Sequence, residues 1–406
     1  MKTAKSLRLH LCLFGRRNTG KSSIVNAVTR QNVAIVSDIP GTTTDPVDKT
    51  MEMQPLGPVV FTDTAGLDDE GALGRLRVDK TRSVFDRADI GIIVTANSVW
   101  GEHEESILAE LAERKTPVIV AFNKTDIAPA DPKLVRDLES RGLVCVKTSA
   151  VEPGGTSDLR QAIVRVAPEE FVQAPPLIAD LVGPGKTVML VVPIDMEAPK
   201  GRLIAPQVHA IRELLDNDSL CYVVKERELK TALDSLREPP ALVVTDSQAF
   251  LKVAADTPSD VPMTSFSILF ARAKGDLVEF VRGAKAIDDL KPHSKVLVCE
   301  ACAHHPIGDD IGRVKIPRWL RQYAGASLEF THMQGHDFPA DPTGYDLVVH
   351  CGGCAINRRE VISRIMRCER AGVPITNYGI CIARTLGVLD RALAPFPAAQ
   401  SVYLRG

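Results

Sequence analysis

The sequence carries little net charge and has no long hydrophobic run. Its 49 Lys and Arg residues nearly balance 51 Asp and Glu residues, so the formal net charge is −2. No basic run interleaved with aromatic residues marks a nucleic-acid groove, so charge gives no reason to expect a nucleic acid as partner. No apolar stretch approaches the length that spans a bilayer, so we expect no membrane association.

The N-terminal stretch MKTAKSLRLHLCLFG lacks the cleavage site of a signal peptide. Basic residues precede a short apolar run, as in a signal peptide, but no small-residue cleavage site follows. The apolar run leads into a glycine-containing loop, which favours a first β-strand. We therefore expect a cytoplasmic protein.

The nine cysteines are unevenly distributed along the 406 residues. In a long chain that we expect to be cytoplasmic, they argue against a disulfide scaffold. Cys12, Cys145 and Cys221 lie in separate apolar runs, which is typical of inert buried thiols. The other six lie in the last third of the chain: Cys299, Cys302, Cys351, Cys354, Cys368 and Cys381.

The length of the chain and the alternation of its elements predict several α/β domains. Residues 8–165 alternate short apolar runs with helical patterns, which indicates a mostly parallel sheet covered by helices. A segment rich in Pro and acidic residues then interrupts the pattern and reads as a linker. Two further α/β patterns follow. We predict three domains, at 1–168, 178–265 and 266–406.

The second and third patterns differ in chemical content. The second has no cluster of chemically useful side chains, so we interpret it as a structural or association module. The third contains four strand candidates, SFSILFA, SKVLVCE, YDLVVHC and ITNYGICIA. The segments GDLVEFVRGAKAIDDL and RREVISRIMRCERAG have helical spacing.

A phosphate-binding loop is predicted near the N-terminus. The run GRRNTGKS, residues 15–22, fits G-x-x-x-x-G-K-[ST] and lies between a predicted strand and a predicted helix. Backbone N–H groups and the helix N-terminus favour phosphate binding there. Lys21 is expected to reach the β- and γ-phosphates, and Ser22 to ligate Mg²⁺. The predicted phosphate-binding residues are Gly15, Asn18, Thr19, Gly20, Lys21, Ser22 and Ser23.

Three further motifs follow in the order that a guanine-nucleotide domain requires. GTTTD supplies Thr42 and Thr43, and DTAG supplies Asp63 and Gly66; Thr43 and Asp63 are expected at Mg²⁺. NKTD supplies Asn123, Lys124 and Asp126, and TSA contributes Ser149 and Ala150 to the base pocket. The Asp126 carboxylate can accept hydrogen bonds from both N1–H and the 2-amino group of guanine. Adenine lacks this pair of donors, so the predicted ligands are GTP and GDP.

The ordered motifs resemble the GTPases of the tRNA-modification and Era/Der type, whose loop reads G-R-x-N-x-G-K-S. The resemblance implies that Asn18 holds K⁺ beside the phosphates, where the ion stabilises transition-state charge. Alternatively, Asn18 only orders the loop. Leu67 follows DTAG, in place of the glutamine that orients water in Ras-like proteins. We predict slow, potassium-stimulated hydrolysis with Lys21, Thr43 and Asn18 as the catalytic residues.

A second group of candidate functional residues, cysteines and histidines, lies near the C-terminus. CEACAHHP and HCGGC each follow an apolar strand candidate. Carboxyl ends of parallel strands gather ligands, and two adjacent strands would bring Cys302 close to Cys351. The glycines between Cys351 and Cys354 leave room for an inorganic core and allow backbone N–H groups to face the sulfurs. Cys299 is interpreted as core; so are Cys368 in a helix and Cys381 in a strand.

The donor atoms alone leave three kinds of site open. Three thiolates and one histidine would make a closed structural zinc site. The same set can hold a 4Fe–4S cluster with one replaceable ligand. A redox-active dithiol at Cys351 and Cys354 is the third option, although the surrounding sequence is not thioredoxin-like.

The motifs in combination resemble the FeFe-hydrogenase maturation GTPases, the HydF family, over essentially the whole chain. The resemblance rests on GRRNTGKS, GTTTD, DTAG, NKTD, CAH and HCGGC, with APKGRLIAPQ in the middle. It implies one 4Fe–4S cluster bound by Cys302, Cys351 and Cys354, with an exchangeable fourth position. His350 could instead orient the loop. The candidates for the fourth position are His304, His350, Asp309 and Asp310.

The resemblance also implies a scaffold and carrier. Two radical-SAM maturases would build a diiron unit on this protein, which would deliver it to apo FeFe-hydrogenase. GTP hydrolysis would regulate partner association, and the middle domain would form a homodimer. The alternative is a potassium-dependent GTPase of RNA modification or ribosome assembly that carries a structural zinc.

Overall fold

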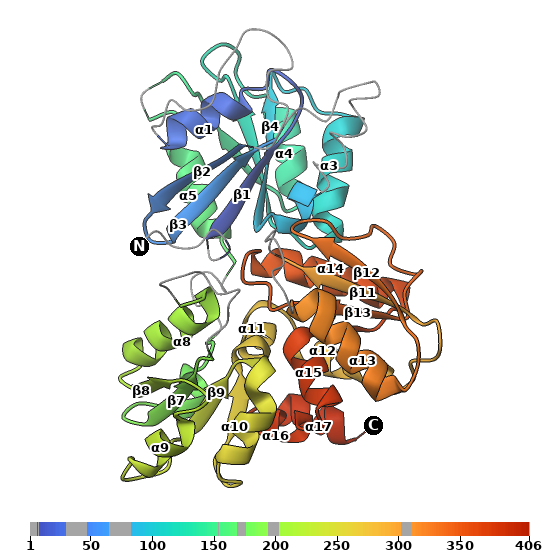
Figure 1. Ribbon diagram of the computed structural model, residues 1–406. Coiled ribbons are helices and arrows are strands. Elements are labelled where there is room, and N and C mark those ends of the chain that lie inside the picture. Colours follow the sequence, from blue (N-terminus) through green and yellow to red (C-terminus); the bar gives the residue numbers. More distant parts are fainter. Residues whose placement is uncertain are drawn as a thin grey trace. The chain divides into compact units, whose positions relative to one another are not determined.

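The computed structural model describes most of the chain, and the chain divides into two compact units, 1–174 and 175–406 (Figure 1). None of the helices in the described part is long and apolar enough to cross a bilayer. The described residues are 6, 8–29, 47–64, 83–152, 154–168, 176–193, 203–301 and 310–405.

The first unit is built on one six-stranded sheet of order β2-β3-β1-β4-β5-β6. Strand β2 runs antiparallel to β3, and the other pairings are parallel. The strands are β1 Leu9–Phe14, β2 Val47–Met53, β3 Gly57–Asp63, β4 Ile90–Ala96, β5 Val118–Asn123 and β6 Val144–Lys147. The helices are α1 Lys21–Thr29, α3 Glu102–Glu113, α4 Pro132–Ser140 and α5 Ser157–Val166.

Both faces of this sheet are covered by helices, as its apolar strands require. Leu9, Leu11 and Leu13 of β1 pack with side chains of α1 and α5, whereas Cys12 and Phe14 pack on the opposite face against α3. Because successive residues of a strand point to opposite faces, a run such as LHLCLF is buried on both sides.

The second unit contains two four-stranded parallel sheets. The first has the order β10-β9-β7-β8 and the second β12-β11-β13-β14. The first comprises β7 Thr187–Val191, β8 Leu220–Val224, β9 Leu242–Thr245 and β10 Met263–Ser265. The second comprises β11 Lys295–Glu300, β12 Glu329–Gln334, β13 Leu347–His350 and β14 Ile375–Asn377.

The helices of the second unit cover both sheets and join them (Figure 1). With the first sheet come α7 Ala179–Val182, α8 Ala205–Asp216, α9 Leu229–Asp234, the 3₁₀ turn η2 Ser247–Ala249, α10 Phe250–Asp256 and α11 Phe266–Lys274. With the second come α12 Leu277–Ala284, η3 Lys285–Ile287, the π-helical turn η4 Ile311–Lys315, α13 Ile316–Ala324, α14 Arg358–Ala371, α15 Tyr378–Thr385, α16 Leu389–Leu393 and α17 Pro397–Leu404.

One continuous hydrophobic core spans both sheets of the second unit. Helix α11 lies between them, because it contacts α8 of the first sheet and also α14 and α15 of the second. The Arg391 guanidinium of α16 adds a polar link, donating to the carbonyls of Ala254 in α10 (2.7 Å) and of Thr257 just after it (2.8 Å).

Two predicted strands of this unit are wrong. SFSILFA forms helix α11, whose first turn is capped by Ser265 accepting from the Ile268 N–H. ITNYGICIA forms the short strand β14 followed by α15, which is capped by Asn377. Cys381 therefore lies in a helix, although it is buried as expected. Both helices are apolar on most sides because they are enclosed, so they lack the polar stripe that usually reveals a helix.

Candidate functional site

The predicted phosphate-binding loop joins β1 to α1, which begins at Lys21. The Lys21 ammonium donates to the carbonyls of Gly15 and Arg16, each at 2.8 Å, so the loop curls around it. Gly15 has φ +137°, and a Cβ there would lie 2.3 Å from the Val94 carbonyl oxygen. The loop passes so close to β4 that only glycine fits at this position.

The two predicted Mg²⁺ ligands within the described residues meet at one point. The Ser22 hydroxyl hydrogen-bonds Asp63 Oδ2 at the end of β3. The other oxygen, Oδ1, is buried without a hydrogen-bond partner. Burial raises the pKa of Asp63, although the Ser22 hydrogen bond and the Lys21 charge oppose it. An unpartnered buried carboxylate oxygen beside a hydroxyl is a fitting donor set for a hydrated Mg²⁺.

The predicted base pocket is tied to the phosphate-binding loop. The Asn123 side-chain amide donates to the Thr19 carbonyl at 2.8 Å. Gly20, at φ +90°, packs so closely that an added Cβ would lie 2.3 Å from Asn123 Nδ2. The Ser149 hydroxyl donates to Asp126 Oδ1 at 2.7 Å and fixes the carboxylate that we expect to read guanine. The motifs from four loops thus form one connected site.

Asn18 is exposed and has φ 61°. Asn adopts this left-handed conformation more readily than most residues, which gives a backbone reason for its presence. Lys124 has the same φ, and Ser23 and Ala150 are partly buried. Thr42, Thr43 and Gly66 lie outside the described residues.

The second candidate site lies at the carboxyl edge of the second sheet of 175–406. Strands β11 and β13 are adjacent and parallel, with Cys299 opposite His350, as the sequence predicts. We call residues 351–357, which follow β13, the thiol loop. The backbone N–H groups of Ala301 and Gly353 point at Cys351 Sγ, at 3.1 and 3.4 Å. Gly353 has φ +66°, which allows this inward turn.

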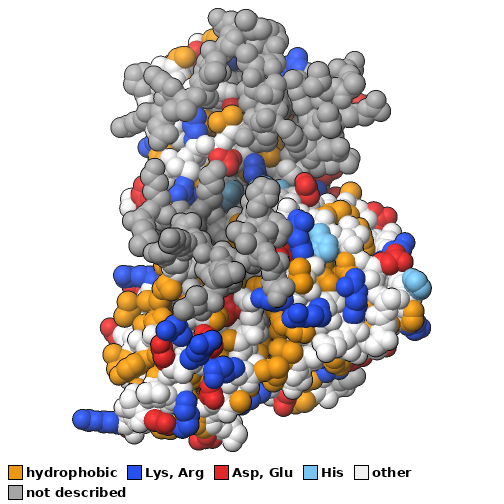
Figure 2. All heavy atoms as spheres, viewed as in Figure 1, with side chains coloured by type: hydrophobic (Ala, Val, Ile, Leu, Met, Phe, Trp, Pro, Cys, Tyr) orange, Lys and Arg blue, Asp and Glu red, His pale blue; other side chains and the backbone are white. Residues whose placement is uncertain are grey.

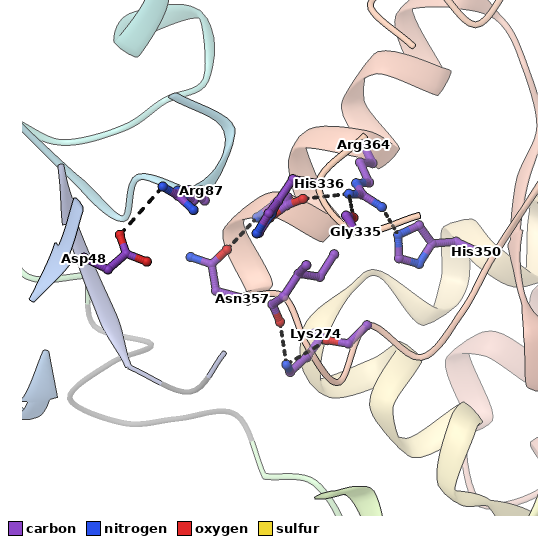
Figure 3. Close-up of polar contacts among 11 residues, drawn as sticks. Asp48, Arg87, Lys274, Gly335, His336, His350, Asn357 and Arg364 are labelled. Carbon is purple, nitrogen blue, oxygen red and sulfur yellow. Dashed lines mark hydrogen bonds and ion pairs between the residues drawn. The ribbon is translucent and has the colours of Figure 1, made fainter. Parts of the chain in front are cut away.

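Two carbonyls of the thiol loop bind the buried ammonium group of Lys274. Lys274, the last residue of α11, donates from Nζ to the carbonyls of Gly353 (2.9 Å) and Ile356 (2.6 Å) (Figure 3). Burial lowers the pKa of Lys274 to about 8, against the opposing influence of Cys354 and Cys351. Burial raises the pKa of Cys351 to about 11, and Cys354 adds to that shift.

His350 is fully buried, and both of its ring nitrogens are engaged. Nδ1 lies 2.7 Å from the Cys351 carbonyl oxygen. Nε2 faces the Arg364 guanidinium (Figure 3), at 3.1 Å from Nη1. Burial lowers the pKa of His350 to about 3, and the Arg364 charge acts in the same direction. The ring is therefore neutral, with Nδ1–H donating and Nε2 accepting. This geometry matches the alternative in which His350 orients the loop.

Arg364 anchors a buried network that no motif reveals. Its Nη2 donates to Glu360 Oε1 (2.6 Å) and to the Gly335 carbonyl (2.8 Å). Glu360 also contacts His336 Nδ1 at 2.9 Å. Burial alone would raise the pKa of Glu360, but His336 and Arg364 outweigh it and lower that pKa. Glu360 and Arg364 are one turn apart on α14, but Gly335, His336 and His350 come from other elements, so the sequence alone does not reveal the network.

Two other predicted features can be placed. Cys299 is buried in β11, and burial raises its thiol pKa, as expected for a core residue; Cys368 is buried in α14. Asp310 is buried and accepts from the Arg313 N–H at 2.7 Å, capping η4. Cys302, His304 and Asp309 lie outside the described residues. Among the residues that are described, no three His, Cys, Asp or Glu side chains gather as a metal site.

Three family models match the chain. One described as a 50S ribosome-binding GTPase matches residues 10–124. The hydrogen maturase F dimerization domain matches residues 177–275, and the hydrogen maturase F tetramerization domain matches residues 278–395. The fold and the first site define the N-terminal unit as an Era-like P-loop GTPase domain. The other two models together match more than half of the chain. The chain therefore belongs to the hydrogen maturase F family.

Three relatives of the GTPase domain are 35–37% identical to this chain over the aligned residues. The tRNA modification GTPase MnmE of Acetivibrio thermocellus is 35% identical over 165 residues, 40% of this chain and 34% of that protein. MnmE of Bacillus subtilis is 37% identical over 157 residues, 38% of this chain and 34% of that protein. GTPase Era of Carboxydothermus hydrogenoformans is 35% identical over 164 residues, 39% of this chain and 54% of that protein. The chain thus spans a third to about half of these relatives' length.

Proposed function

We propose that the protein is a GTP-hydrolysing scaffold in FeFe-hydrogenase maturation. It holds a 4Fe–4S cluster at the thiol loop, receives a diiron unit from two radical-SAM maturases and delivers it to apo FeFe-hydrogenase. The observation that carries the proposal is the loop at the carboxyl edge of β13. There, two cysteines follow a buried strand, and two backbone N–H groups already point at one of the sulfurs.

The chemistry of this loop fits an iron–sulfur cluster. Thiolates are the preferred ligands of such clusters, and N–H···S contacts stabilise thiolate charge. A Cβ added at Gly352 would only touch Phe270 Cβ, at 3.7 Å, and Ser267 Oγ, at 3.9 Å, so the loop is not tightly packed there. The third proposed ligand, Cys302, is the next residue in the chain after Ala301, whose N–H contacts Cys351 Sγ. When bound, the cluster would supply a coordination position that exchanges ligands.

The fourth position is proposed for an exchangeable ligand. His350 is already held by the Cys351 carbonyl and Arg364, so its engaged nitrogens favour a positioning role. One carboxylate oxygen of Asp310 caps η4. His304 and Asp309 therefore stand ahead of these two as protein ligands, and a small exogenous ligand would serve the carrier role equally well.

The nucleotide arm is proposed to hydrolyse GTP to GDP and phosphate. Lys21 would bind the β- and γ-phosphates, and Ser22, Thr43 and Asp63 would hold Mg²⁺. Asp126, fixed by Ser149, would read guanine. We further propose that Asn18 helps hold K⁺, which would stimulate hydrolysis. Rates in potassium and sodium buffers would be equal if Asn18 only orders the loop.

Association of copies is proposed to use the edge strand β8, in keeping with the dimerization domain that it belongs to. Leu220, Tyr222 and Val223 of β8 are exposed, as is Leu215 of α8. Hydrophobic side chains are prominent over the region of these elements in Figure 2. An exposed apolar edge strand is a ready template for pairing with another chain.

The cluster assignment is tested with Cys302→Ser, Cys351→Ser and Cys354→Ser in the full chain. After anaerobic reconstitution, each variant should lose most of its iron and sulfide and should fail to activate apo-hydrogenase. Cys145→Ser, a partly buried cysteine of the other unit, is the matched control and should load normally. Full iron content in all three variants would refute the site, and colourless protein with bound zinc would favour an RNA-modification or ribosome-assembly GTPase.

The nucleotide assignment is tested separately with Asp126→Asn. The carboxylate that pairs with guanine is replaced by an amide, so affinity for GTP should fall at least tenfold while xanthosine triphosphate binds better. Cluster loading should be unchanged. Unaltered preference for GTP would contradict the assigned base pocket.

A further inference from the structure

Lys274 is an unusual residue to find beneath a thiol loop. Its side chain is 5% exposed, and its ammonium binds two loop carbonyls and lies 5.7 Å from the centre of the Phe270 ring. Among the described residues, no carboxylate lies within ion-pair distance of it. Glu360, whose charge acts on Lys274 from a distance, is committed to Arg364 and His336.

A buried cation without a paired anion is costly, because desolvation is not offset by a Coulombic partner. Two neutral carbonyls supply only part of what water would provide. Both carbonyls belong to the loop that carries Cys351 and Cys354, and Gly353 directly precedes Cys354 in the chain. The position of Lys274 therefore makes physical sense if these sulfurs are anionic when the protein functions.

We infer that Lys274 is the resident counter-cation and positioning residue of the cluster site, an inference that rests on the proposed function. A 4Fe–4S core bound by three thiolates carries net negative charge, and one-electron reduction adds another. A buried ammonium stabilises the reduced form more than the oxidised form, because Coulombic energy grows with the charge it faces. Lys274 thus raises the reduction potential of the cluster.

The same contacts position the loop. The Gly353 N–H faces Cys351 Sγ, while the Gly353 carbonyl faces the Lys274 ammonium. The peptides on both sides of Gly353 are thereby oriented by one cation and one sulfur. Arg358, at the start of α14, ties the loop to the same helix end by donating to the carbonyls of Ala273 (3.1 Å) and Gly275 (2.9 Å).

This inference also makes the site composite. Lys274 lies in the segment that matches the dimerization domain, whereas the thiol loop lies in the segment that matches the tetramerization domain. The first segment therefore contributes a charge to the cluster pocket in addition to any role in association. The second sheet alone would hold the sulfurs without their counter-cation.

The test compares three substitutions in the reconstituted full chain. Lys274→Met removes the charge and the hydrogen bonds, Lys274→Gln keeps a hydrogen-bond donor without the charge, and Lys274→Arg keeps the charge. The readouts are iron and sulfide content and the reduction potential from a titration followed by electron paramagnetic resonance. Lys252→Met, an exposed lysine that pairs with Asp256 on α10, is the control.

The Met and Gln variants should have a more negative reduction potential than the wild type, while Arg and the control stay close to it. A Gln variant with the wild-type potential would overturn the counter-cation role. If Met and Gln instead load little iron, loading by Arg at the wild-type level supports the inference, and equal loss in Arg overturns it. Failure of the proposed function is distinct, because the wild type itself would then load no cluster.

Discussion

The two candidate sites occupy the same kind of place but are constructed differently. Each lies at the carboxyl ends of adjacent parallel strands, where loops leave the sheet. The nucleotide site is assembled from short motifs whose members touch one another, as Gly20, Asn123 and Thr19 do. The thiol loop depends on Lys274 and Arg364, which arrive from helices outside any motif. The contacts of the nucleotide site therefore lie within its sequence motifs, whereas those of the thiol loop come partly from outside them.

Each of the two sites contains a buried polar atom that lacks a hydrogen-bond partner, an acceptor at one site and a donor at the other. Within the described part of the chain, Asp63 Oδ1, an acceptor, is buried without a hydrogen-bond partner at the site assigned to Mg²⁺. The Tyr378 hydroxyl, a donor one residue beyond β14, is likewise buried without a partner among the described residues. His350 pairs with Asn377, so Cys351 and Tyr378 follow directly on neighbouring strands. An orphan acceptor suits a cation, and an orphan donor suits an anionic group.

The largest expected effect comes from breaking the network behind the thiol loop. Arg364→Leu leaves the buried Glu360 carboxylate without its guanidinium, which should cost about 3–5 kcal/mol of unfolding free energy. Trp319 reports on this unit once Trp100, the other tryptophan, is replaced by Phe. Denaturant unfolding followed by Trp319 fluorescence measures the change.

The control for Arg364→Leu is Arg212→Leu, an exposed residue paired with Asp216, which should cost no more than about 1 kcal/mol. Nucleotide affinity should not change in either variant. Equal destabilisation by the two substitutions would show that the buried network is not what holds the loop.

A somewhat smaller effect is expected at the nucleotide edge. Gly20→Ala introduces a Cβ 2.3 Å from Asn123 Nδ2 at a position with φ +90°. We expect a hundredfold loss of GTP affinity, about 2.7 kcal/mol, because the base and phosphate loops are forced apart. Equilibrium binding of a fluorescent guanine nucleotide measures it.

Gly142→Ala separates crowding from backbone strain. Gly142 has φ +82°, but an added Cβ would meet no heavy atom within 4 Å. This control should lose about 1 kcal/mol of stability and keep its affinity for GTP. A loss of affinity equal to that of Gly20→Ala would refute the close contact as the cause.

The smallest effect tests the orphan donor. Tyr378→Phe removes a hydroxyl with no hydrogen-bond partner, so the metal-free protein should gain about 1 kcal/mol of unfolding free energy. Tyr323→Phe, which loses a 2.8 Å hydrogen bond to Asp288 at the surface, should instead be neutral or slightly destabilised. Denaturant unfolding of both metal-free variants measures the change in the free energy of unfolding. Destabilisation by Tyr378→Phe would mean that the hydroxyl has a partner after all.

The sequence predicted the parts of the molecule in which chemistry is local. The phosphate loop, the α/β fold and the adjacency of β11 and β13 follow from apolar runs and motif order. Helices α11 and α15 were missed because enclosed helices show no amphipathic period. Reading SFSILFA as a strand also hid Lys274, three residues further on, since a lysine just beyond a strand gives no sign that it turns under a loop.

Contacts between residues on different elements could not be predicted from the sequence either. Arg364 lies 14 residues after His350, and its other partner, Gly335, belongs to a different loop. Only the packing of α14 brings Arg364 close to both residues. His350 was predicted as a possible ligand because histidine beside cysteine is typical of metal sites. Its burial and its two neighbours, which decide its tautomer, are properties of the fold.

The unbroken core that runs through residues 175–406 has a thermodynamic corollary. Because the two sheets share buried side chains, we expect them to unfold together, so that a ligand bound at one sheet raises the free energy of unfolding of both. The proposed iron uptake at the second sheet should then protect the strands of the first sheet against denaturant, although no iron touches them.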